Sequence, residues 1–187
     1  MNRIEITSRP ATRRALAIGL LVAVLLALGT VTPAVLAAIT CPGFTCQGTN
    51  SNDTLRGTEV YDEIYGFGGD DTIYGFAGND ALRGDEQTDP GLDGADRIYG
   101  GRGNDLLSSH GGADLLVGGR GNDTINAQDY PGHPPGTDTI KSGRGDDTIY
   151  AADHVKDVID CGLGRDYVLF DRDFDTVTNC EDKNPVA

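Results

Sequence analysis

The sequence is short of positive charge. Its 187 residues include 15 lysines and arginines against 29 aspartates and glutamates, which gives a net charge of −14 at pH 7. This imbalance argues against nucleic acid and anionic membrane surfaces as partners, and it makes cations the natural ligands. Low hydrophobicity with high net charge is also typical of disordered chains. A folded structure therefore requires a regular pattern elsewhere in the sequence.

The motifs of common enzymes are missing as well. The chain has three histidines, His110, His133 and His154, but no H-E-x-x-H zinc motif and no G-x-S-x-G nucleophile elbow. Each histidine lies in or beside an expected turn, where we expect a solvated side chain. Paired aspartates recur throughout, so no single pair stands out as a general acid and base. We therefore expect no enzymatic activity.

The first 38 residues have the composition of a signal peptide. Four arginines within the first 14 residues precede a charge-free apolar stretch that begins at Ala15, and Ala37 and Ala38 follow Pro33. This order is typical of a cleaved secretory leader. A retained membrane-spanning helix is the alternative, because the stretch is long enough to cross a bilayer, but Gly29 and Pro33 weaken a helix there. We expect cleavage after Ala37 or Ala38, a secreted protein, and no stable membrane insertion afterwards.

A nine-residue repeat dominates the remaining chain. Thirteen aspartates are each followed two residues later by leucine, isoleucine or valine, and the step between them is nine residues except before Asp96, Asp138 and Asp157. The thirteen are Asp53, Asp62, Asp71, Asp80, Asp96, Asp105, Asp114, Asp123, Asp138, Asp147, Asp157, Asp166 and Asp175. Such internal periodicity indicates a repeat architecture and argues against disorder.

Each repeat divides into a turn and a strand. Glycine, asparagine and aspartate precede each repeat aspartate, as in the G-G-R-G-N-D sequence of residues 100–105, and these residue types tolerate the positive φ of tight turns. The next three residues, such as Thr124-Ile125-Asn126, form a strand whose central aliphatic side chain points inward. Two repeats then make one coil. The sequence predicts an all-β fold whose coils stack into a flattened solenoid.

The turns and strands together match the pattern G-G-x-G-x-D-x-U-x, in which U is aliphatic. From Gly48 to about Thr178 the chain resembles the repeats-in-toxin family. The resemblance implies a parallel β-roll, a right-handed β-solenoid, with Ca²⁺ ions held between successive turns on the same edge. Their ligands are aspartate carboxylates and backbone carbonyls, the hard oxygen ligands that Ca²⁺ needs. The resemblance assigns metal binding to Asp71, Asp80, Asp105, Asp114, Asp123, Asp147 and Asp166, and to the turn glycines Gly101, Gly103, Gly119, Gly121, Gly143 and Gly145.

An amino-terminal signal peptide takes the place of the toxins' carboxy-terminal secretion signal, so the chain is identified as a small exported bacterial member of the family. Its short strands bury little apolar surface against a large entropy cost, and its charge opposes compaction. We therefore expect the chain to be largely unfolded without calcium. The alternative function is a calcium-stabilised module for surface adhesion or carbohydrate binding.

The four cysteines indicate an oxidising compartment. Cys161 begins one turn and Cys180 lies at the second position of the turn one coil later, so stacking at about 4.8 Å per strand brings them to disulfide distance. We expect that pair to close the last coil, and Cys41 to pair with Cys46 as an amino-terminal cap. A four-cysteine metal site is disfavoured because C-x-x-C spacing is absent. The expected segments are a signal peptide (1–38), a cap (39–47), the repeats (48–178) and a closing segment (179–187).

The turns alternate between two edges when the repeats are numbered from Asp53. The even-numbered turns include the best glycine motifs and end at Asp80, Asp105, Asp123, Asp147 and Asp166. Both long insertions, Gly84 to Gly94 and Ala127 to Gly136, precede odd-numbered repeats. We expect them to break the register between the turns ending at Asp71 and Asp114, and to make calcium sites on that edge fewer or weaker. The loops are then either free to contact a partner or tolerated insertions with none.

Tyrosines mark the outward faces of the strands. Tyr65, Tyr74, Tyr99 and Tyr150 occupy the same outward strand position, and Tyr74 and Tyr99 are expected to be neighbours. The simpler interpretation is a stacked ladder that protects the strand surface, and carbohydrate recognition is the alternative.

Overall fold

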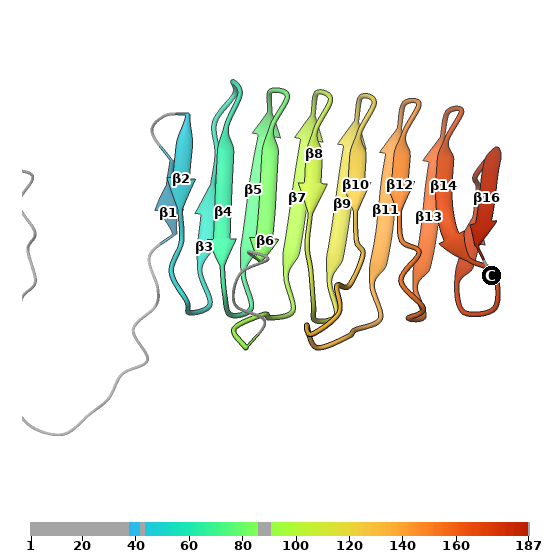
Figure 1. The fold of residues 1–187 in the computed structure, drawn as a ribbon. Coiled ribbons are helices and arrows are strands. Elements are labelled where there is room, and N and C mark those ends of the chain that lie inside the picture. Colours follow the sequence, from blue (N-terminus) through green and yellow to red (C-terminus); the bar gives the residue numbers. More distant parts are fainter. Residues whose placement is uncertain (1–37, 42–43, 86–90, 187) are drawn as a thin grey trace, which may run out of the picture. The chain divides into compact units, whose positions relative to one another are not determined.

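The computed structural model describes residues 38–41, 44–85 and 91–186. These residues form two eight-stranded sheets in which all neighbouring strands are parallel (Figure 1). The chain alternates between the sheets, which is the parallel β-roll that the sequence predicts. The expected signal peptide, apart from Ala38, lies outside the described residues. Within the described part, no helix is long and apolar enough to span a membrane.

Odd-numbered strands make one sheet, the odd sheet, and even-numbered strands make the even sheet. The odd sheet contains β1 (Ile39–Thr40), β3 (Thr54–Arg56), β5 (Thr72–Ala77), β7 (Arg97–Arg102), β9 (Leu115–Arg120), β11 (Thr139–Arg144), β13 (Val158–Leu163) and β15 (Thr176–Thr178). The even sheet contains β2 (Thr45–Gln47), β4 (Glu63–Phe67), β6 (Ala81–Asp85), β8 (Leu106–Ser108), β10 (Thr124–Asn126), β12 (Thr148–Tyr150), β14 (Tyr167–Asp171) and β16 (Asp182–Val186).

One column of aliphatic side chains from each sheet fills the interior. The fully buried residues are Leu55, Ile73, Ile98, Leu116, Ile140 and Ile159 in the odd sheet and Ile64, Leu82, Leu107, Ile125, Ile149 and Val168 in the even sheet. Within each sheet they align in register from coil to coil. The repeat register read from the sequence is therefore confirmed, although Val177, in the last coil, is only partly buried.

The middle strands of the odd sheet are longer than the three residues expected. β5, β7, β9, β11 and β13 each have six, because the backbone stays paired into the turn, for example at Gly101 with Gly119. This extension creates a second inward position beside the turn. That position is held by the small residues Gly75, Gly100, Gly118, Ser142 and Cys161.

Disulfides close both ends of the roll in the expected pairing. Cys41 bonds to Cys46 with their Cα atoms 5.3 Å apart, and Cys161 bonds to Cys180 with their Cα atoms 5.2 Å apart. Cys161 is fully buried and packs with the aliphatic core. The second bridge therefore ties the last coil to the one before it.

The outward tyrosines form contacts among themselves and with arginines. Tyr74 and Tyr99 are neighbours in register, as expected, and their rings stack with centroids 5.1 Å apart. The guanidinium of Arg56 lies over the Tyr74 ring at 5.1 Å, and that of Arg83 lies over Tyr65 at 4.8 Å. Protein groups already contact the ring faces, which favours the protective ladder over sugar recognition at these rings.

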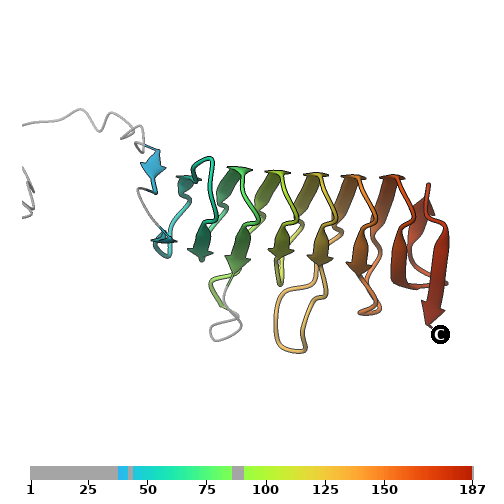
Figure 2. The same cartoon turned by 90° about the horizontal axis from the view of Figure 1, so that it is seen from above.

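Both long insertions project from the same edge of the roll, as the alternation of repeats predicts (Figure 2). We call this the odd edge, and the opposite one, which carries the turns of the even-numbered repeats, the even edge. The first insertion is described in part, because residues 86–90 lie outside the described residues.

Candidate metal sites along the two edges

The repeat aspartates form a hydrogen-bonded ladder on each edge. One carboxylate oxygen, Oδ1, accepts the backbone N–H of the repeat aspartate one coil earlier, at 2.7 to 2.9 Å. The odd ladder links Asp53, Asp71, Asp96, Asp114, Asp138, Asp157 and Asp175, and the even ladder links Asp62, Asp80, Asp105, Asp123, Asp147 and Asp166.

The odd ladder continues past both insertions, which corrects the expectation of a broken register. The amide of Asp71 donates to Asp96 at 2.8 Å, and that of Asp96 donates to Asp114 at 2.8 Å. The inserted residues project from the turn before its last residue. The repeat aspartate that ends the turn, Asp96 or Asp138, therefore keeps its place in the ladder. The further expectation, that calcium sites are fewer or weaker on this edge, stays a prediction.

The second carboxylate oxygen is left without a hydrogen-bond donor at many of these aspartates. Oδ2 is buried and unpartnered at all seven aspartates that the sequence predicts as ligands: Asp71, Asp80, Asp105, Asp114, Asp123, Asp147 and Asp166. An ionised carboxylate is an acceptor only, and burying it without a partner is costly. A bound cation would supply the partner that these oxygens lack.

Backbone carbonyls of the next coil face the same unpartnered oxygens. A Cβ atom added at Gly100 would meet both Asp105 Oδ2 at 2.5 Å and the Gly118 carbonyl oxygen at 2.7 Å. At Gly75 it would meet Asp80 Oδ2 and the Gly100 oxygen, each at 2.6 Å. In these two turns carboxylate and carbonyl oxygens thus border one small space, and this donor set fits a hard cation such as Ca²⁺.

The six turn glycines predicted as ligands have a conformational role in the turns. All six have positive φ, from 112° at Gly101 to 135° at Gly145, a region that side chains disfavour. Each is also closely stacked, since a Cβ at Gly121 would overlap the Gly103 carbonyl. The glycines that border Oδ2 of a predicted ligand are Gly66, Gly75, Gly100 and Gly118, which sequence analysis missed. Ser142 and Cys161 hold the same position in later coils, so a small side chain is tolerated there.

Within the described residues, no three histidine, cysteine, aspartate or glutamate side chains converge on a point that could hold a metal ion. The carboxylates of each ladder are instead spread along the edge, one per coil. A cation between two turns would therefore take most of its ligands from the backbone.

Stacking buried carboxylates raises their pKa values. Burial, with repulsion from the neighbouring ladder aspartates, raises the pKa of Asp80 and of Asp123 to about 7 from 3.8. On the odd edge the same causes raise the pKa of Asp114 to about 8. The cation-free ladders therefore hold protons near neutral pH, or repel where they are ionised.

At the ends of the ladders, protein groups make hydrogen bonds that the aspartates in the middle lack. Thr49 donates its N–H and hydroxyl to Asp53 Oδ2 at 2.7 and 2.8 Å, and Thr58 does the same for Asp62 Oδ2 at 2.6 and 2.9 Å. At the other end, Glu181 takes the aspartate's place and accepts the Asp166 amide at 3.0 Å. At Asp53 and Asp62, threonine thus supplies the donors that Oδ2 lacks in the middle coils.

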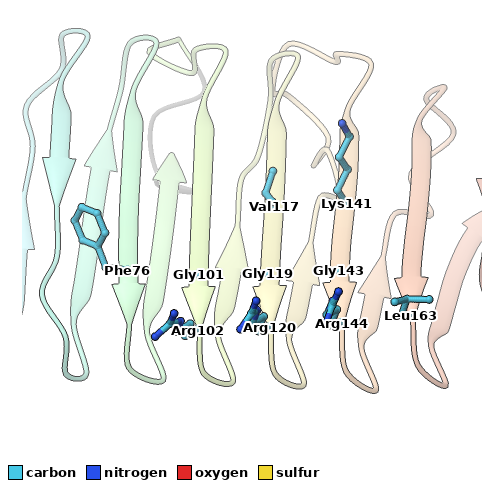
Figure 3. Close-up of a pocket in the computed structure, with 10 residues that line it drawn as sticks. All are labelled: Phe76, Gly101, Arg102, Val117, Gly119, Arg120, Lys141, Gly143, Arg144 and Leu163. Carbon is cyan, nitrogen blue, oxygen red and sulfur yellow. The ribbon is translucent and has the colours of Figure 1, made fainter.

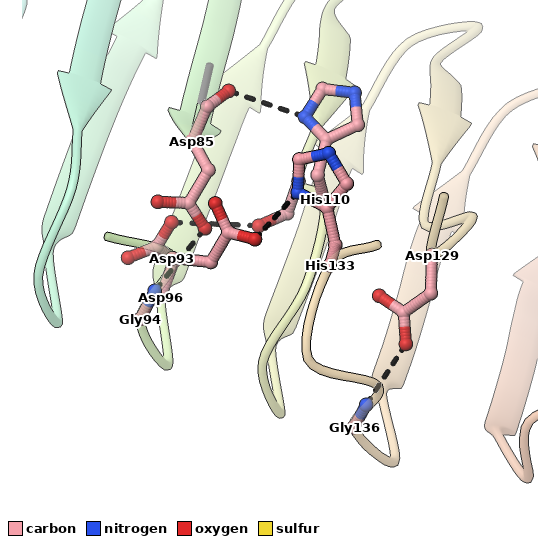
Figure 4. A network of polar contacts seen from close by, with 9 residues as sticks. Asp85, Asp93, Gly94, Asp96, His110, Asp129, His133 and Gly136 are labelled. Carbon is pink, nitrogen blue, oxygen red and sulfur yellow. Dashed lines mark hydrogen bonds and ion pairs between the residues drawn. The ribbon is translucent and has the colours of Figure 1, made fainter. Parts of the chain in front are cut away.

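The two insertions contact each other on the odd edge (Figure 4). His133 Nδ1 lies 2.6 Å from Asp93 Oδ2, and both side chains are buried. The rings of His110 and Tyr130 lie 5.1 Å apart, and His110 is only 5 % exposed. The expectation of solvated histidines is therefore wrong for His110 and His133, whereas His154 is exposed. His133 contacts Asp93 of the other insertion, and His110, in the turn between β8 and β9, packs against Tyr130 and His133 of the second insertion.

Asp85 lies beneath these loops and is fully buried. Burial raises its pKa to about 9, with further contributions from Asp96 and Asp93. One of its carboxylate oxygens lacks a hydrogen-bond partner, and the other accepts the Gly94 amide at 3.4 Å. The first insertion thus adds a carboxylate beside the odd ladder.

Comparison with known proteins gives one family. A family model for the RTX calcium-binding nonapeptide repeat matches residues 47–82, 62–89, 90–125 and 135–154, together more than half of the chain. No curated protein matches the chain significantly. The matched segments end at residue 154, but the coils continue in the same register through β13 and β15.

Proposed function

Because the chain belongs to the RTX calcium-binding nonapeptide repeat family, whose repeats bind Ca²⁺, we propose that it is an exported protein whose folding is coupled to calcium. The observation that carries this proposal is the set of eight ladder aspartates, the seven predicted ligands and Asp157, whose Oδ2 is buried without a partner. Ca²⁺ binding would neutralise the carboxylates and add ligand bonds that link each turn to the next.

The proposed ligands are the seven aspartates Asp71, Asp80, Asp105, Asp114, Asp123, Asp147 and Asp166, together with backbone carbonyls of the glycine turns. The proposed organisation is a signal peptide (1–38), a disulfide cap (39–47), the calcium-binding roll (48–178) and a closing segment (179–187). We propose a binding role and no catalysis, since the paired carboxylates belong to one repeating ladder.

Circular dichroism of the chain from residue 39 during a calcium titration tests the coupling. We expect a coil spectrum in chelator and a cooperative gain of β-structure, because each coil packs only on its neighbours. The midpoint should lie in the range of extracellular modules, roughly 10⁻⁴ to 10⁻³ M. A full β-spectrum in excess chelator would contradict the proposal, and magnesium at equal concentration serves as the control cation.

A further inference from the structure

A basic groove crosses the odd sheet next to the even edge (Figure 3). The groove is open to solvent, has a volume of about 620 Å³, and is lined across β7, β9 and β11 by Arg102, Arg120 and Arg144. Lys141 also lines it, farther along β11 from the arginine row (Figure 3). The three arginines pair in register on neighbouring strands, one coil apart. The glycines beside them leave the floor of the groove without side chains, and exposed Phe76 and Leu163 lie at its two ends.

The β-roll does not require arginine at this position. In β5 and β13 the same register position is held by Ala77 and Leu163. Across the described residues the ion pairs are Arg83 with Glu63, His133 with Asp93 and Arg165 with Asp182, so none involves the groove arginines. The three exposed arginines lie on strands about 4.8 Å apart, so their like charges repel one another. A ligand with repeated negative charge would relieve that repulsion.

We propose that this groove binds an extended anionic polysaccharide, whose carboxylate or sulfate groups pair with Arg102, Arg120 and Arg144. Guanidinium groups bind such oxyanions with paired hydrogen bonds. A sugar chain also presents apolar ring faces, which suit Val117 and the exposed Phe76. The arginines lie in a single row, one per coil, so a single polymer chain fits them better than a broad lipid surface does. The charge of −14 on the whole chain makes this local basic row distinct.

Binding of sulfated dextran to the protein in saturating calcium, measured by isothermal titration calorimetry, tests the proposal. Sulfated dextran avoids the strong calcium binding of carboxylated polymers, and neutral dextran of equal length is the ligand control. The groove variant carries Arg102→Gln, Arg120→Gln and Arg144→Gln. The matched variant carries Arg56→Gln, Arg97→Gln and Arg172→Gln, exposed arginines outside the groove with the same change in net charge.

We expect the groove variant to bind sulfated dextran at least about tenfold more weakly, and the matched variant to bind almost as the unchanged protein does. Equal loss in both variants would mean that overall charge governs binding, and would overturn the proposal. The proposal would also be overturned if the groove variant bound dextran as before but needed more calcium to fold. The arginines would then serve to balance the negative charge of the aspartate ladder.

Anionic lipid vesicles provide the remaining alternative. If the protein bound vesicles through the groove arginines and did not bind sulfated dextran, that result would show that the groove binds membranes, and it would overturn the polysaccharide proposal. The proposal rests on the folded roll, so circular dichroism is recorded before each ligand is added. A chain that stays a coil in calcium would refute the proposed folding mechanism, whereas a folded chain that binds no dextran would refute only the groove.

Discussion

At the scale of the residue, most aspartates in the middle of each ladder use their two carboxylate oxygens for different tasks. Oδ1 of Asp123 accepts the Asp105 amide at 2.9 Å and so fixes the stacking of the turns, while Oδ2 is buried without a donor. The first task needs only a hydrogen-bond acceptor, whereas the second needs a positive partner. A substitution by asparagine separates the two, because it keeps one acceptor oxygen and removes the charge.

Asp123→Asn should therefore raise the calcium concentration at the folding midpoint by on the order of tenfold. The amide can still accept from Asp105, so the ladder stays intact, but the cation loses a charged ligand. The control is Asp53→Asn, because Asp53 Oδ2 already accepts from Thr49. Calcium titrations followed by circular dichroism measure both midpoints, and equal shifts would show that the carboxylate acts only as a ladder acceptor.

At the scale of the element, the last coil depends on one covalent link. The disulfide between Cys161 and Cys180 joins β13 to the segment after β15. Val177, in β15, is only partly buried, so this coil has less apolar packing than the central coils. Cys180→Ser should fray the residues after Cys161 and raise the calcium midpoint, since a loop of about this length is worth roughly 3 kcal/mol. Hydrogen exchange resolved by peptide measures the fraying.

The central coils should keep their protection from exchange in that variant, because their contacts are only with adjacent coils. Cys46→Ser provides the comparison, because its bridge closes a much shorter loop, with a sequence separation of 5 against 19. Free thiols at both Cys161 and Cys180 in the exported protein would show that the bridge does not form.

The second insertion should be dispensable for folding. Asp114 and Asp138 remain joined across it at 2.9 Å, so the ladder does not depend on the intervening loop. Replacing residues 128–135 by a short glycine linker should leave the calcium midpoint within about twofold, because lengthening or shortening a surface loop changes closure entropy little. Calcium titration followed by circular dichroism measures this midpoint. A rise in the midpoint as large as that caused by Asp123→Asn would show that the loop helps to hold calcium.

The sequence predicts the repeating part of the fold well because each coil repeats the same two constraints. An aliphatic residue such as Ile98 must point inward, and an aspartate such as Asp96 must come two residues earlier. The exceptions arise from tertiary partners that no repeat pattern contains. His133 finds Asp93 across two separate insertions, and Thr58 caps Asp62 through a turn of atypical sequence. The contact of His133 with Asp93 has no local sequence signature, whereas the cap joins residues only four apart in a G-T-x-x-x-D turn that also occurs at Thr49 and Asp53.

At the scale of the whole molecule, acidic charge opposes folding unless something neutralises it. Calcium is one means and protons are another, because burial and neighbouring carboxylates raise the pKa of ladder aspartates such as Asp80, to about 7, and Asp114, to about 8. Calcium and protons bind the same carboxylate oxygens. Lowering the pH should therefore favour folding without calcium and oppose calcium-driven folding when calcium is present.

Without calcium, acidification should favour the folded state. The ladder carboxylates have raised pKa values in the folded chain and ordinary values near 3.8 in the unfolded chain, so the folded state binds more protons between these limits. Its stability is greatest below the unfolded pKa and is lost as pH rises from about 4 to about 8. Metal-free protein should thus gain β-structure when the pH is lowered across this range, as measured by circular dichroism after exhaustive dialysis.

With calcium, the trend reverses. The cation binds ionised carboxylates, so protons compete with it, and the calcium midpoint should rise as the pH falls from about 8 to about 5. The effect should be larger for the whole chain than for a variant with Asp80→Asn and Asp123→Asn, which lacks two of the groups whose pKa values burial raises to about 7. Calcium titrations at several pH values measure the shift. A midpoint independent of pH in the unchanged protein would mean that the ladder carboxylates are not calcium ligands.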